Sequence, residues 1–358
     1  MKLMSRREVI MTAAGDIQFT EEPRGLFESD AVSLFMNAPL PVGNLEMVLS
    51  KSEQQADSRR SNLRSDPRLA PILKKLNCQV MSFANNHCFD FGEVGFLDTL
   101  DEMNRLGIRI VGAGKTVAEA QAPVLVEQGV KVSFLAFSSS FWPGSTASPS
   151  KPGILSIGVT SQWDVNARLQ LVQPGTPPRV FTEPIEEDLK TVREIVSKAS
   201  ADSDLVIVFA HWGVAYRNEP TDYQVQIAHE LIDSGAHLIL GGHPHVIQAV
   251  EHYKSGVVFY SLGNFIFQAE DLPPWGTRHR PAFWKRWSRQ SILVKTHMTT
   301  GRIGHVDIWP LSLSECGTPF LAKGKEGENI LDALCYLSEL EGTILETNYE
   351  DLRASLDL

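Results

Sequence analysis

The chain has 358 residues, of which 43% are hydrophobic and 21% charged, and its formal net charge is −10. These values are typical of an ordinary globular enzyme, and the length allows one large domain whose core can hold a rigid site. The acidic balance argues against non-specific binding to nucleic acid or to an anionic membrane surface.

Apolar runs of strand length alternate with amphipathic helical stretches through most of the chain. The predicted strands cover residues 9–14, 42–49, 80–84, 108–111, 123–126, 130–137, 205–209 and 237–240. The predicted helices cover residues 67–76, 93–106, 185–200, 223–234 and 329–340. The remaining apolar runs resemble antiparallel strands, at residues 257–260, 291–297 and 303–310. This order predicts an α/β fold with a mixed sheet system, built as one domain.

Some segments fall outside this alternation. Residues 138–183 are rich in Ser, Pro, Gly and Thr, so we expect a long irregular loop of a kind that is usually functional, with a lid over a substrate as one role. A loop that opens with Gly15-Asp16 follows the predicted strand at residues 9–14. Residues 268–290 form a basic and aromatic insert. We expect a catalytic domain over residues 1–312, with residues 313–358 as a helical extension packed on it.

The apolar run at residues 9–14 bears on the compartment of the protein. It is too short for a signal peptide and far too short to span a bilayer. No other stretch of the sequence reaches membrane-spanning length. We therefore expect a soluble, cytoplasmic protein.

Side chains with metal-binding atoms follow several of the predicted strands. The clearest case is His243-Pro244-His245, where two imidazoles leave the end of the strand at residues 237–240 on a glycine-rich turn. Because strand ends share one edge of an α/β sheet, we expect such side chains to converge there. The converging set is Asp16, Glu46, Asn86, His211, His243 and His245. Two carboxylates, one amide and three imidazoles suit Mn, Zn or Fe.

Each member of this set also has an ordinary structural explanation. Asp16 after a glycine is typical of a helix cap or turn, Asn85-Asn86 of a plain turn, and His211 of a core histidine. Taken alone, each of these explanations is the better one. Taken together they explain less than a metal site does, because every cluster follows the same end of a strand.

The order and the residue types of these clusters resemble those of the CapA family of bacterial capsule and poly-γ-glutamate proteins, within the calcineurin-like metallophosphoesterase superfamily. The resemblance covers roughly residues 9–267 and rests on Gly15-Asp16, Asn44-Leu45-Glu46, Ala84-Asn85-Asn86-His87 through Asp90 and Gly92, His211-Trp212-Gly213, His243-Pro244-His245 and Tyr260-Ser261-Leu262-Gly263-Asn264-Phe265. It implies a four-layer α/β/β/α sandwich with metals at the edge of the sheets.

The resemblance also implies roles for the site residues. One divalent ion (Mn, Zn, Fe, Ca or Mg) would be held by Asp16, Glu46 and His245, and a second by Glu46, Asn86, His211 and His243. His87 would donate or accept a proton beside the metals. The sequence departs from the superfamily pattern at two positions, because Gln18 stands where a histidine is usual and Glu46 where an Asp is usual. One tight metal with a weak or empty neighbour is therefore an alternative to a metal pair.

A basic and aromatic segment, residues 275–289, follows the region of resemblance and reverses the local charge of an acidic chain. One interpretation is a solvated loop anchored by its tryptophans. The other is a substrate clamp, because arginines pair with carboxylates and aromatic rings hold apolar side chains. The predicted substrate-binding residues are Trp275, Arg278, Arg280, Trp284 and Arg286, with Asn264. A peptide with a free carboxylate fits this clamp, and the net charge makes single-stranded nucleic acid a poorer fit.

A divalent metal beside imidazoles supports attack of water on a phosphoester, attack of water on an amide such as a γ-glutamyl bond, or removal and return of a proton next to a carbonyl. The resemblance extends to CapA-like peptide epimerases of lasso-peptide pathways (the MslH type), which invert a residue of a ribosomal precursor peptide, a C-terminal tryptophan in that case. We predict a peptide epimerase, with His87, Asp90, His211 and His245 as catalytic residues. The alternatives are a CapA-like metallohydrolase and a non-catalytic, polymer-binding capsule protein. Oligomeric state is not predicted.

Overall fold

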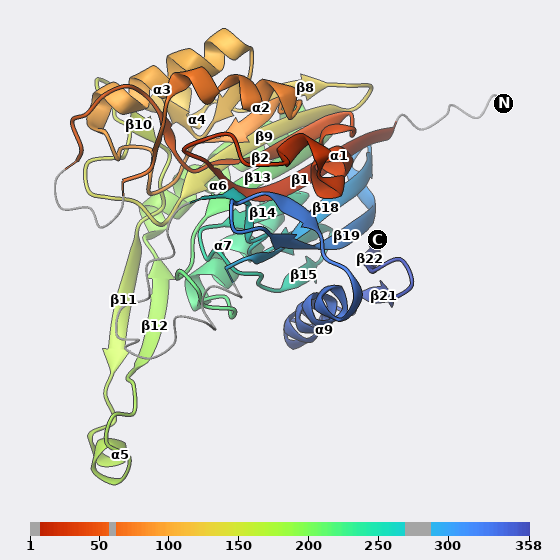
Figure 1. Ribbon diagram of the computed structural model, residues 1–358. Coiled ribbons are helices and arrows are strands. Elements are labelled where there is room, and N and C mark those ends of the chain that lie inside the picture. The colour runs from red at the N-terminus through yellow and green to blue at the C-terminus, as the bar shows by residue number, and fades with distance from the viewer. Residues whose placement is uncertain (1–7, 57–61, 269–287) are drawn as a thin grey trace.

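The computed structural model describes residues 8–56, 62–268 and 288–358, and within them the strands form two main sheets (Figure 1). The larger sheet has ten strands. Its main path is β21 (Glu346–Asn348), β22 (Arg353–Asp357), β19 (Arg302–Leu313), β18 (Gln290–Thr299), β1 (Glu8–Gln18), β2 (Leu40–Leu45), β5 (Val80–Ser82) and β6 (Arg109–Val111). Off this path, β17 (Asn264–Phe267) pairs with β1 and β20 (Pro319–Leu321) pairs with β19.

The smaller sheet has six strands in the described part of the chain. Their order is β15 (Val250–Tyr253), β16 (Gly256–Phe259), β14 (Leu238–Gly242), β13 (Leu205–His211), β9 (Lys131–Ser138) and β8 (Val124–Glu127). The strands β9, β13, β14 and β16 run parallel, as do β1, β2, β5 and β6 of the larger sheet. All seven residues of β13 are buried, which is why its sequence is a continuous apolar run rather than an alternating one.

Helices pack on both sheets. In the larger sheet, α1 (Asp30–Met36) contacts β1 and α3 (Gly92–Leu106) contacts β6, and α2 (Pro71–Lys75) and α4 (Val117–Gln121) lie on the same side as α3 in Figure 1. In the smaller sheet, α6 (Glu186–Asp202) contacts β9 and β13, and α7 (Asp222–Asp233) packs beside α6. The sheets contact each other through β1 and β14 and through β6 and β9. The predicted α/β class is confirmed, and the arrangement is consistent with a metallophosphoesterase-like fold.

The first strand is longer than the sequence predicts. It continues through Gln18, so Gly15 and Asp16 lie inside β1 and not in a loop after it. The reason is tertiary pairing that the local sequence does not reveal. Residues Asp16 to Gln18 pair in parallel with β17, and the register shifts between Asp16 and Ile17. Likewise, β16 pairs in parallel with β14 and antiparallel with β15, so the purely antiparallel prediction for residues 257–260 is wrong.

The segment 138–183 is not irregular throughout. It contains β10 (Gly153–Ile154), which pairs with β7 (Ala113–Gly114), and a two-stranded ribbon of β11 (Val159–Asp164) and β12 (Arg179–Pro184), with α5 (Ala167–Val172) at its tip. Figure 1 shows this ribbon projecting from the body of the molecule. The Pro, Gly and Ser residues between these strands obscured the β-branched and aromatic residues within them.

The remaining elements are short or C-terminal. The strands β3 (Val48–Leu49) and β4 (Arg64–Ser65) pair with each other, and the 3-10 turns are η1 (Leu26–Glu28) and η2 (Pro67–Leu69). Beyond residue 313, the helix α9 (Gly324–Leu340) contacts both β15 and β19, and the strands β20, β21 and β22 extend the larger sheet. Among the helices of the described residues, none has the length and apolar character that crossing a bilayer requires.

Candidate metal centre

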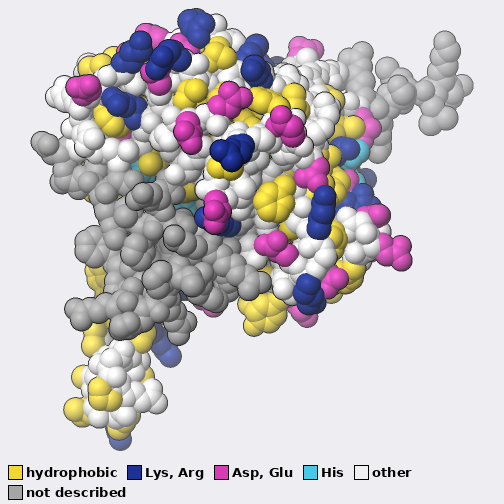
Figure 2. Space-filling view, in the orientation of Figure 1, with side chains coloured by type: hydrophobic (Ala, Val, Ile, Leu, Met, Phe, Trp, Pro, Cys, Tyr) yellow, Lys and Arg dark blue, Asp and Glu magenta, His cyan; other side chains and the backbone are white. Residues whose placement is uncertain are grey.

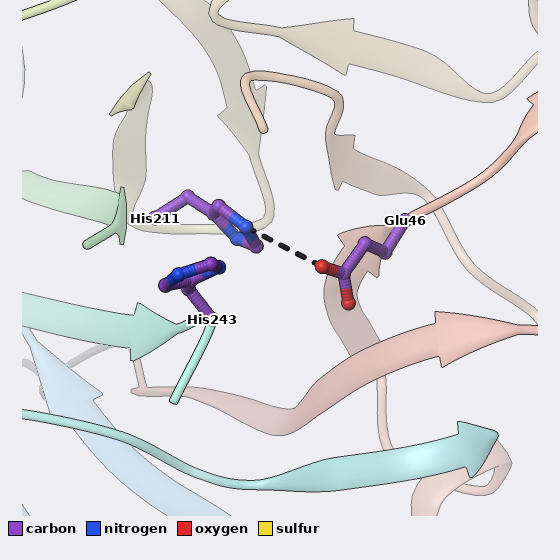
Figure 3. Close-up of side chains that lie close together, drawn as sticks. All are labelled: Glu46, His211 and His243. Atoms are coloured by element: carbon purple, nitrogen blue, oxygen red, sulfur yellow. Dashed lines mark ion pairs between the residues drawn. The ribbon is translucent and has the colours of Figure 1, made fainter. Parts of the chain in front are cut away.

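The six predicted metal-binding residues meet at the edge where the parallel strands of both sheets end. Asp16 lies near the end of β1, Glu46 directly follows β2, and Asn86 follows β5. From the other sheet, His211 is the last residue of β13, and the His243-Pro244-His245 turn follows β14. In Figure 3, the side chains of Glu46, His211 and His243 point toward one another. The edge-of-sheet geometry expected from the sequence therefore brings these side chains together.

Two glycines allow close approaches at this site, one between β1 and the segment that leads into β17 and one between the two sheets. A Cβ atom on Gly15 would lie 1.8 Å from the carbonyl oxygen of Gly263, which is not compatible with any side chain. A Cβ atom on Gly242 would lie 2.7 Å from Oδ1 of Asp16. These positions need glycine because backbone or a carboxylate occupies the place of the first side-chain atom.

The histidine turn holds an uncommon backbone conformation. His243 has φ of 92° and His245 has φ of 57°, both in the left-handed region that residues with a Cβ atom rarely adopt. The backbone N–H of His243 donates to Oδ2 of Asp16 at 3.2 Å, which ties the turn to the other sheet. The centroids of the two rings lie 5.8 Å apart, so His243 and His245 can contact different ligand groups although only one residue separates them in the sequence. Strain of this kind is typical of sites where geometry serves a function.

One group of ligand atoms gathers around His211. Its Nε2 lies 2.6 Å from Oδ1 of Asn86 and 3.4 Å from Oε1 of Glu46. The His211 and His243 ring centroids are 4.9 Å apart. Glu46, His211 and His243 offer ligand atoms that all lie within 4.8 Å of one another.

A second group gathers around His245 and shares Glu46 with the first. His245 Nδ1 lies 2.9 Å from Oδ1 of Asn264 and 3.4 Å from Oδ2 of Asp16, and its Nε2 lies 3.8 Å from Oε1 of Glu46. The ligand atoms of Asp16, Glu46 and His245 also fall within 4.8 Å of one another. The division of the histidine pair between two groups thus matches the division that the resemblance implies.

The polar atoms at the centre of these groups fit a divalent cation. Glu46 is fully buried, and neither of its carboxylate oxygens has a hydrogen bond among the described residues. The buried Nδ1 of His243 has none either. A buried carboxylate without hydrogen bonds is costly unless a positive charge compensates it. Carboxylate, amide and imidazole donors suit Mn, Zn or Fe, and the identity and number of the ions are not fixed by this donor set.

The electrostatics of the site give the two histidines of the turn different pKa values. Burial, together with the neighbouring His211 and His245, holds the pKa of His243 well below its usual value, which keeps this imidazole neutral as a metal ligand must be. Burial opposes charge on His245 as well, but Glu46 and Asp16 outweigh it and raise its pKa to about 9. Burial likewise opposes ionisation of Asp16, yet its contact with His245 holds the pKa of this carboxyl well below the ordinary range.

His87 and Asp90 form a hydrogen-bonded pair beside the cluster. His87 Nδ1 lies 2.6 Å from Oδ2 of Asp90, and the same oxygen accepts from the backbone N–H of Leu63 at 2.6 Å. The Asp90 side chain is fully buried, and the His87 side chain is 13% exposed. The carboxylate therefore fixes the orientation of an imidazole that still has access to solvent.

Three residues that the sequence did not single out complete the site, two of them buried and Ser140 partly buried. Asn44 donates from Nδ2 to Oδ1 of Asp16 at 2.9 Å and accepts at Oδ1 from Asn85 Nδ2 at 3.2 Å. Asn85 also donates to the carbonyl oxygen of Leu45 at 2.8 Å, and Ser140 Oγ lies 3.1 Å from Nε2 of His243. Both asparagines belong to motifs already recognised in the sequence, so a signal existed for them. Ser140 had none, because it lies in the segment read as irregular.

Gln18 is buried on β1 near this centre. Its Oε1 accepts from the backbone N–H of Gln268 at 2.8 Å, and its Nε2 has no hydrogen bond among the described residues. The only oxygen of this amide is thus already engaged, and the amide nitrogen is a donor that cannot bind a cation. The Gln18 amide thus holds the backbone at Gln268.

The predicted substrate-binding residues are only partly covered by the structure. Asn264 lies at the site, where its Nδ2 donates to the carbonyl oxygen of Ser288 at 2.9 Å. The other five lie outside the described residues: Trp275, Arg278, Arg280, Trp284 and Arg286. Arg289, at the end of the same basic segment, lines a small pocket with Phe267, whose ring centroid is 5.0 Å from that of His245.

Comparison with known proteins identifies the family of the chain. Residues 4–269 match the family model described as bacterial capsule synthesis protein PGA_cap. The chain belongs to this family. It is 30% identical over 286 residues to the PGA biosynthesis protein CapA of Bacillus subtilis, with 79% of this chain and 63% of that protein covered. It is 28% identical over 331 residues to the capsule biosynthesis protein CapA of Bacillus anthracis, with 89% and 71% covered.

The matches cover only part of some relatives, and the structural likeness is low. The chain spans less than two thirds of the length of the Bacillus subtilis protein. Among solved structures, it is similar to GAP50, the anchor in the inner membrane complex of Plasmodium, over 96% of this chain and 99% of that chain, with a TM-score of 0.32 and 9% identity. A likeness at that level carries no argument about function. The family is therefore shown by the sequence match.

Proposed function

We propose that this PGA_cap family protein is a divalent-metal-dependent peptide epimerase. In this proposal it inverts the α-carbon of an amino acid in a ribosomal precursor peptide of lasso-peptide biosynthesis, with a C-terminal tryptophan as the first residue to test. The proposal rests on one observation above all. Two imidazole–carboxylate pairs follow strands of different sheets: His87 with Asp90, directly after the cluster residue Asn86, and His245 with Asp16, within the cluster around Glu46.

An epimerase needs a base on one side of a carbon atom and an acid on the other. His87 with Asp90 follows β5 of the larger sheet, and His245 with Asp16 and Asn264 follows β14 of the smaller one. Each imidazole is oriented by a carboxylate partner, which fixes the position of the ring. This arrangement suits proton removal on one face of a substrate and proton return on the other.

The proposed reaction conserves atoms and electrons. A divalent ion held by Glu46, His211 and His243 would supply the Lewis acidity that makes the hydrogen next to a carbonyl more acidic. His87 accepts the α-proton, and the electron pair of the broken C–H bond stays on the substrate as an enolate. His245 donates a proton to the opposite face, and the new C–H bond uses the same electron pair. The reverse inversion uses the two residues in exchanged roles, and proton exchange with water restores their starting forms before the next forward turnover.

The pocket at Arg289 supports a peptide substrate with a free carboxylate. It adjoins the site through Phe267 and through Asn264, which bonds both His245 and the backbone at Ser288. An arginine guanidinium can bind a carboxylate through two parallel hydrogen bonds. The pocket also includes Gln268 and Ser314, whose polar atoms can form hydrogen bonds with a peptide end.

The test is proton exchange in deuterium oxide. The protein is incubated with Mn²⁺ or Zn²⁺ and with precursor-type peptides that end in tryptophan, and mass spectrometry follows the α-carbon. We expect deuterium incorporation and a mixture of stereoisomers, without cleavage of the peptide. Cleavage of the peptide, or turnover of a phosphoester with no exchange in any peptide, would overturn the proposal.

A matched pair of variants makes this test specific. His87→Gln removes the proposed base and should lower exchange by about 100-fold or more. His229→Gln breaks another imidazole–carboxylate pair, His229 Nε2 to Glu251 Oε1 at 2.8 Å, which lies outside the site. Exchange by this control should stay at the level of the unmodified protein. Equal losses in both variants would mean that the effect is one of folding.

A CapA-like metallohydrolase is the second candidate function. The observation that favours it is Glu46, whose carboxylate belongs to both ligand groups, as a residue bridging a metal pair would. The hydrolase predicts release of phosphate or amine, which His211→Ala would abolish. The exchange experiment separates the two functions because hydrolysis leaves the α-hydrogen in place.

A further inference from the structure

The projecting ribbon, here called the arm and defined as residues 159–184, has two faces of different character. Side chains directly opposite each other on paired strands share a face. The pairing of β11 with β12 therefore places six uncharged residues on one face, the apolar face: Val159, Ser161, Trp163, Val180, Thr182 and Pro184. The other face, the charged face, carries Thr160, Gln162, Asp164, Arg179, Phe181 and Glu183.

The base of the apolar face is already covered by the body of the molecule. Pro184 is buried, and Val159 packs against the core. Thr182 joins the arm to α7, because its Oγ1 accepts from the backbone N–H of Tyr223 at 3.2 Å and its own N–H reaches Asp222. The apolar face is thus the continuation of a buried surface beyond the edge of the body.

The outer half of this face is exposed. Trp163 is 65% exposed and its cross-strand neighbour Val180 is 44% exposed. At the tip, Val165, Leu171 and Val172 are also exposed, and Figure 2 shows hydrophobic side chains on the tip of the projecting ribbon. A two-stranded ribbon is marginally stable unless something packs on it, and exposed apolar patches on soluble proteins commonly mark interaction sites.

Charge restricts the part of the surface through which a second copy of this chain can dock. The whole chain carries a net charge of −10, so the bodies of two copies repel each other. Within the arm, Asp164 and Glu183 balance Arg168 and Arg179. The arm is therefore neutral, and its apolar face carries no charge at all. It is also held away from the acidic body, since a six-residue strand extends roughly 20 Å.

Area agrees with this occupant. The exposed apolar side chains of this face and of the tip offer on the order of a few hundred Å² for burial, which is the size of a weak, transient interface rather than the roughly 800 Å² per partner of a standard one. A two-fold arrangement would bring the same apolar face from each copy into contact, which is the isologous geometry of the commonest homodimers. We propose that the arm is a dimerisation element, which packs through its apolar face, centred on Trp163, against the arm of a second copy.

Sedimentation of the full chain over a range of concentrations tests the proposal. We expect a monomer–dimer equilibrium with a dissociation constant below about 100 µM. Trp163→Glu should weaken the association at least about tenfold, as truncation of a central aromatic anchor does. Gln162→Glu adds the same charge to the neighbouring position of the same strand, on the charged face, and should change the dissociation constant by less than about twofold. Added salt should strengthen the association of the unmodified protein, because it screens repulsion between the acidic bodies.

The contrary outcomes are equally definite. A chain that stays monomeric overturns the proposal, and so does association that Trp163→Glu and Gln162→Glu weaken equally. A monomer that pellets with anionic phospholipid vesicles assigns the face to a membrane surface instead, and one that retains a tryptophan-ended peptide assigns it to substrate. Val180→Glu repeats the test at the facing position, and an unchanged thermal midpoint shows that either variant has folded.

Discussion

The metal centre and the arm invert the usual distribution of side chains in opposite ways. At the centre, the carboxylates of Asp16 and Glu46 are fully buried. On the arm, Trp163 and Leu171 are exposed, the latter at 82%. Both arrangements are costly for an isolated chain, because buried charge and exposed apolar surface each oppose folding. The difference lies in what would compensate the cost, a small cation in one region and a large apolar surface in the other.

The two regions also differ in how they are supported. The centre receives side chains from five strands in two sheets, and its asparagines bond both to ligands and to the backbone. The arm is a single ribbon attached at its base. A change at the centre should therefore spread through the fold, whereas a change on the arm should stay local. The following predictions test this contrast.

The largest effect should come from Glu46→Gln. This variant removes the charge shared by both ligand groups, so divalent-ion affinity should fall by more than about 100-fold. The measurement is metal content after dialysis, together with the rise of the thermal midpoint on adding Mn²⁺ or Zn²⁺, which should vanish in the variant. The control is Glu251→Gln, which changes a carboxylate held by His229 and Tyr260 elsewhere. Metal retention by Glu46→Gln would contradict the assignment of Glu46 as a shared ligand.

A smaller but broader effect is expected from Gly242→Ala. The added methyl group would lie 2.7 Å from Oδ1 of Asp16, so the edges of the sheets must separate. We expect a loss of about 1–3 kcal/mol in the free energy of unfolding, as overpacking typically gives, and a weaker metal site. Gly304→Ala is the matched control, since its methyl group would meet its nearest atom at 3.4 Å. Urea unfolding of both variants measures the difference, and equal stabilities would show that the close approach is not required.

The smallest effect concerns a third region, at the end of the larger sheet. His305 lies 2.5 Å from Oδ1 of Asp357 and 3.0 Å from Oδ1 of Asp307. Burial opposes charge on His305, but the two carboxylates outweigh it and raise its pKa. The stabilisation is therefore fully present below the unfolded value of about 6.5 and is lost as the pH rises through the raised pKa. Because the pair is near the surface, we expect less than about 1 kcal/mol. Urea unfolding at acidic and alkaline pH should show this loss in the unmodified protein and not in His305→Gln.

Much of the centre was predictable because its signals are local in the sequence. Each ligand follows an apolar run, and the rule that parallel strands end at one edge does the rest. The asparagines Asn44 and Asn85 were within reach of the same reasoning, since they stand beside Glu46 and Asn86. The position of Ser140 was not, because a contact between the end of β9 and the turn after β14 depends on sheet packing.

The arm was not predictable for a different reason. Turn residues dominate the composition of segment 138–183, and its two strands are held by each other rather than by a periodic pattern that extends into the sheets. The extension of β1 through Asp16 was not predicted for a related reason, since β17, its partner, is far away in the sequence. Pairing between distant segments leaves little trace in either of them.

The helix α9 has a consequence for how sheets of different molecules can meet. β15 is the outermost strand of the smaller sheet, and an outermost strand offers N–H groups to which another chain can add. Here Val250 N–H donates to Ser338 Oγ at 2.9 Å and His252 N–H donates to Thr343 Oγ1 at 2.8 Å. Side chains at the end of α9 and just beyond it thus cap this edge. Growth of the sheet into a cross-molecular aggregate is blocked there, and the protection comes from two hydroxyl groups.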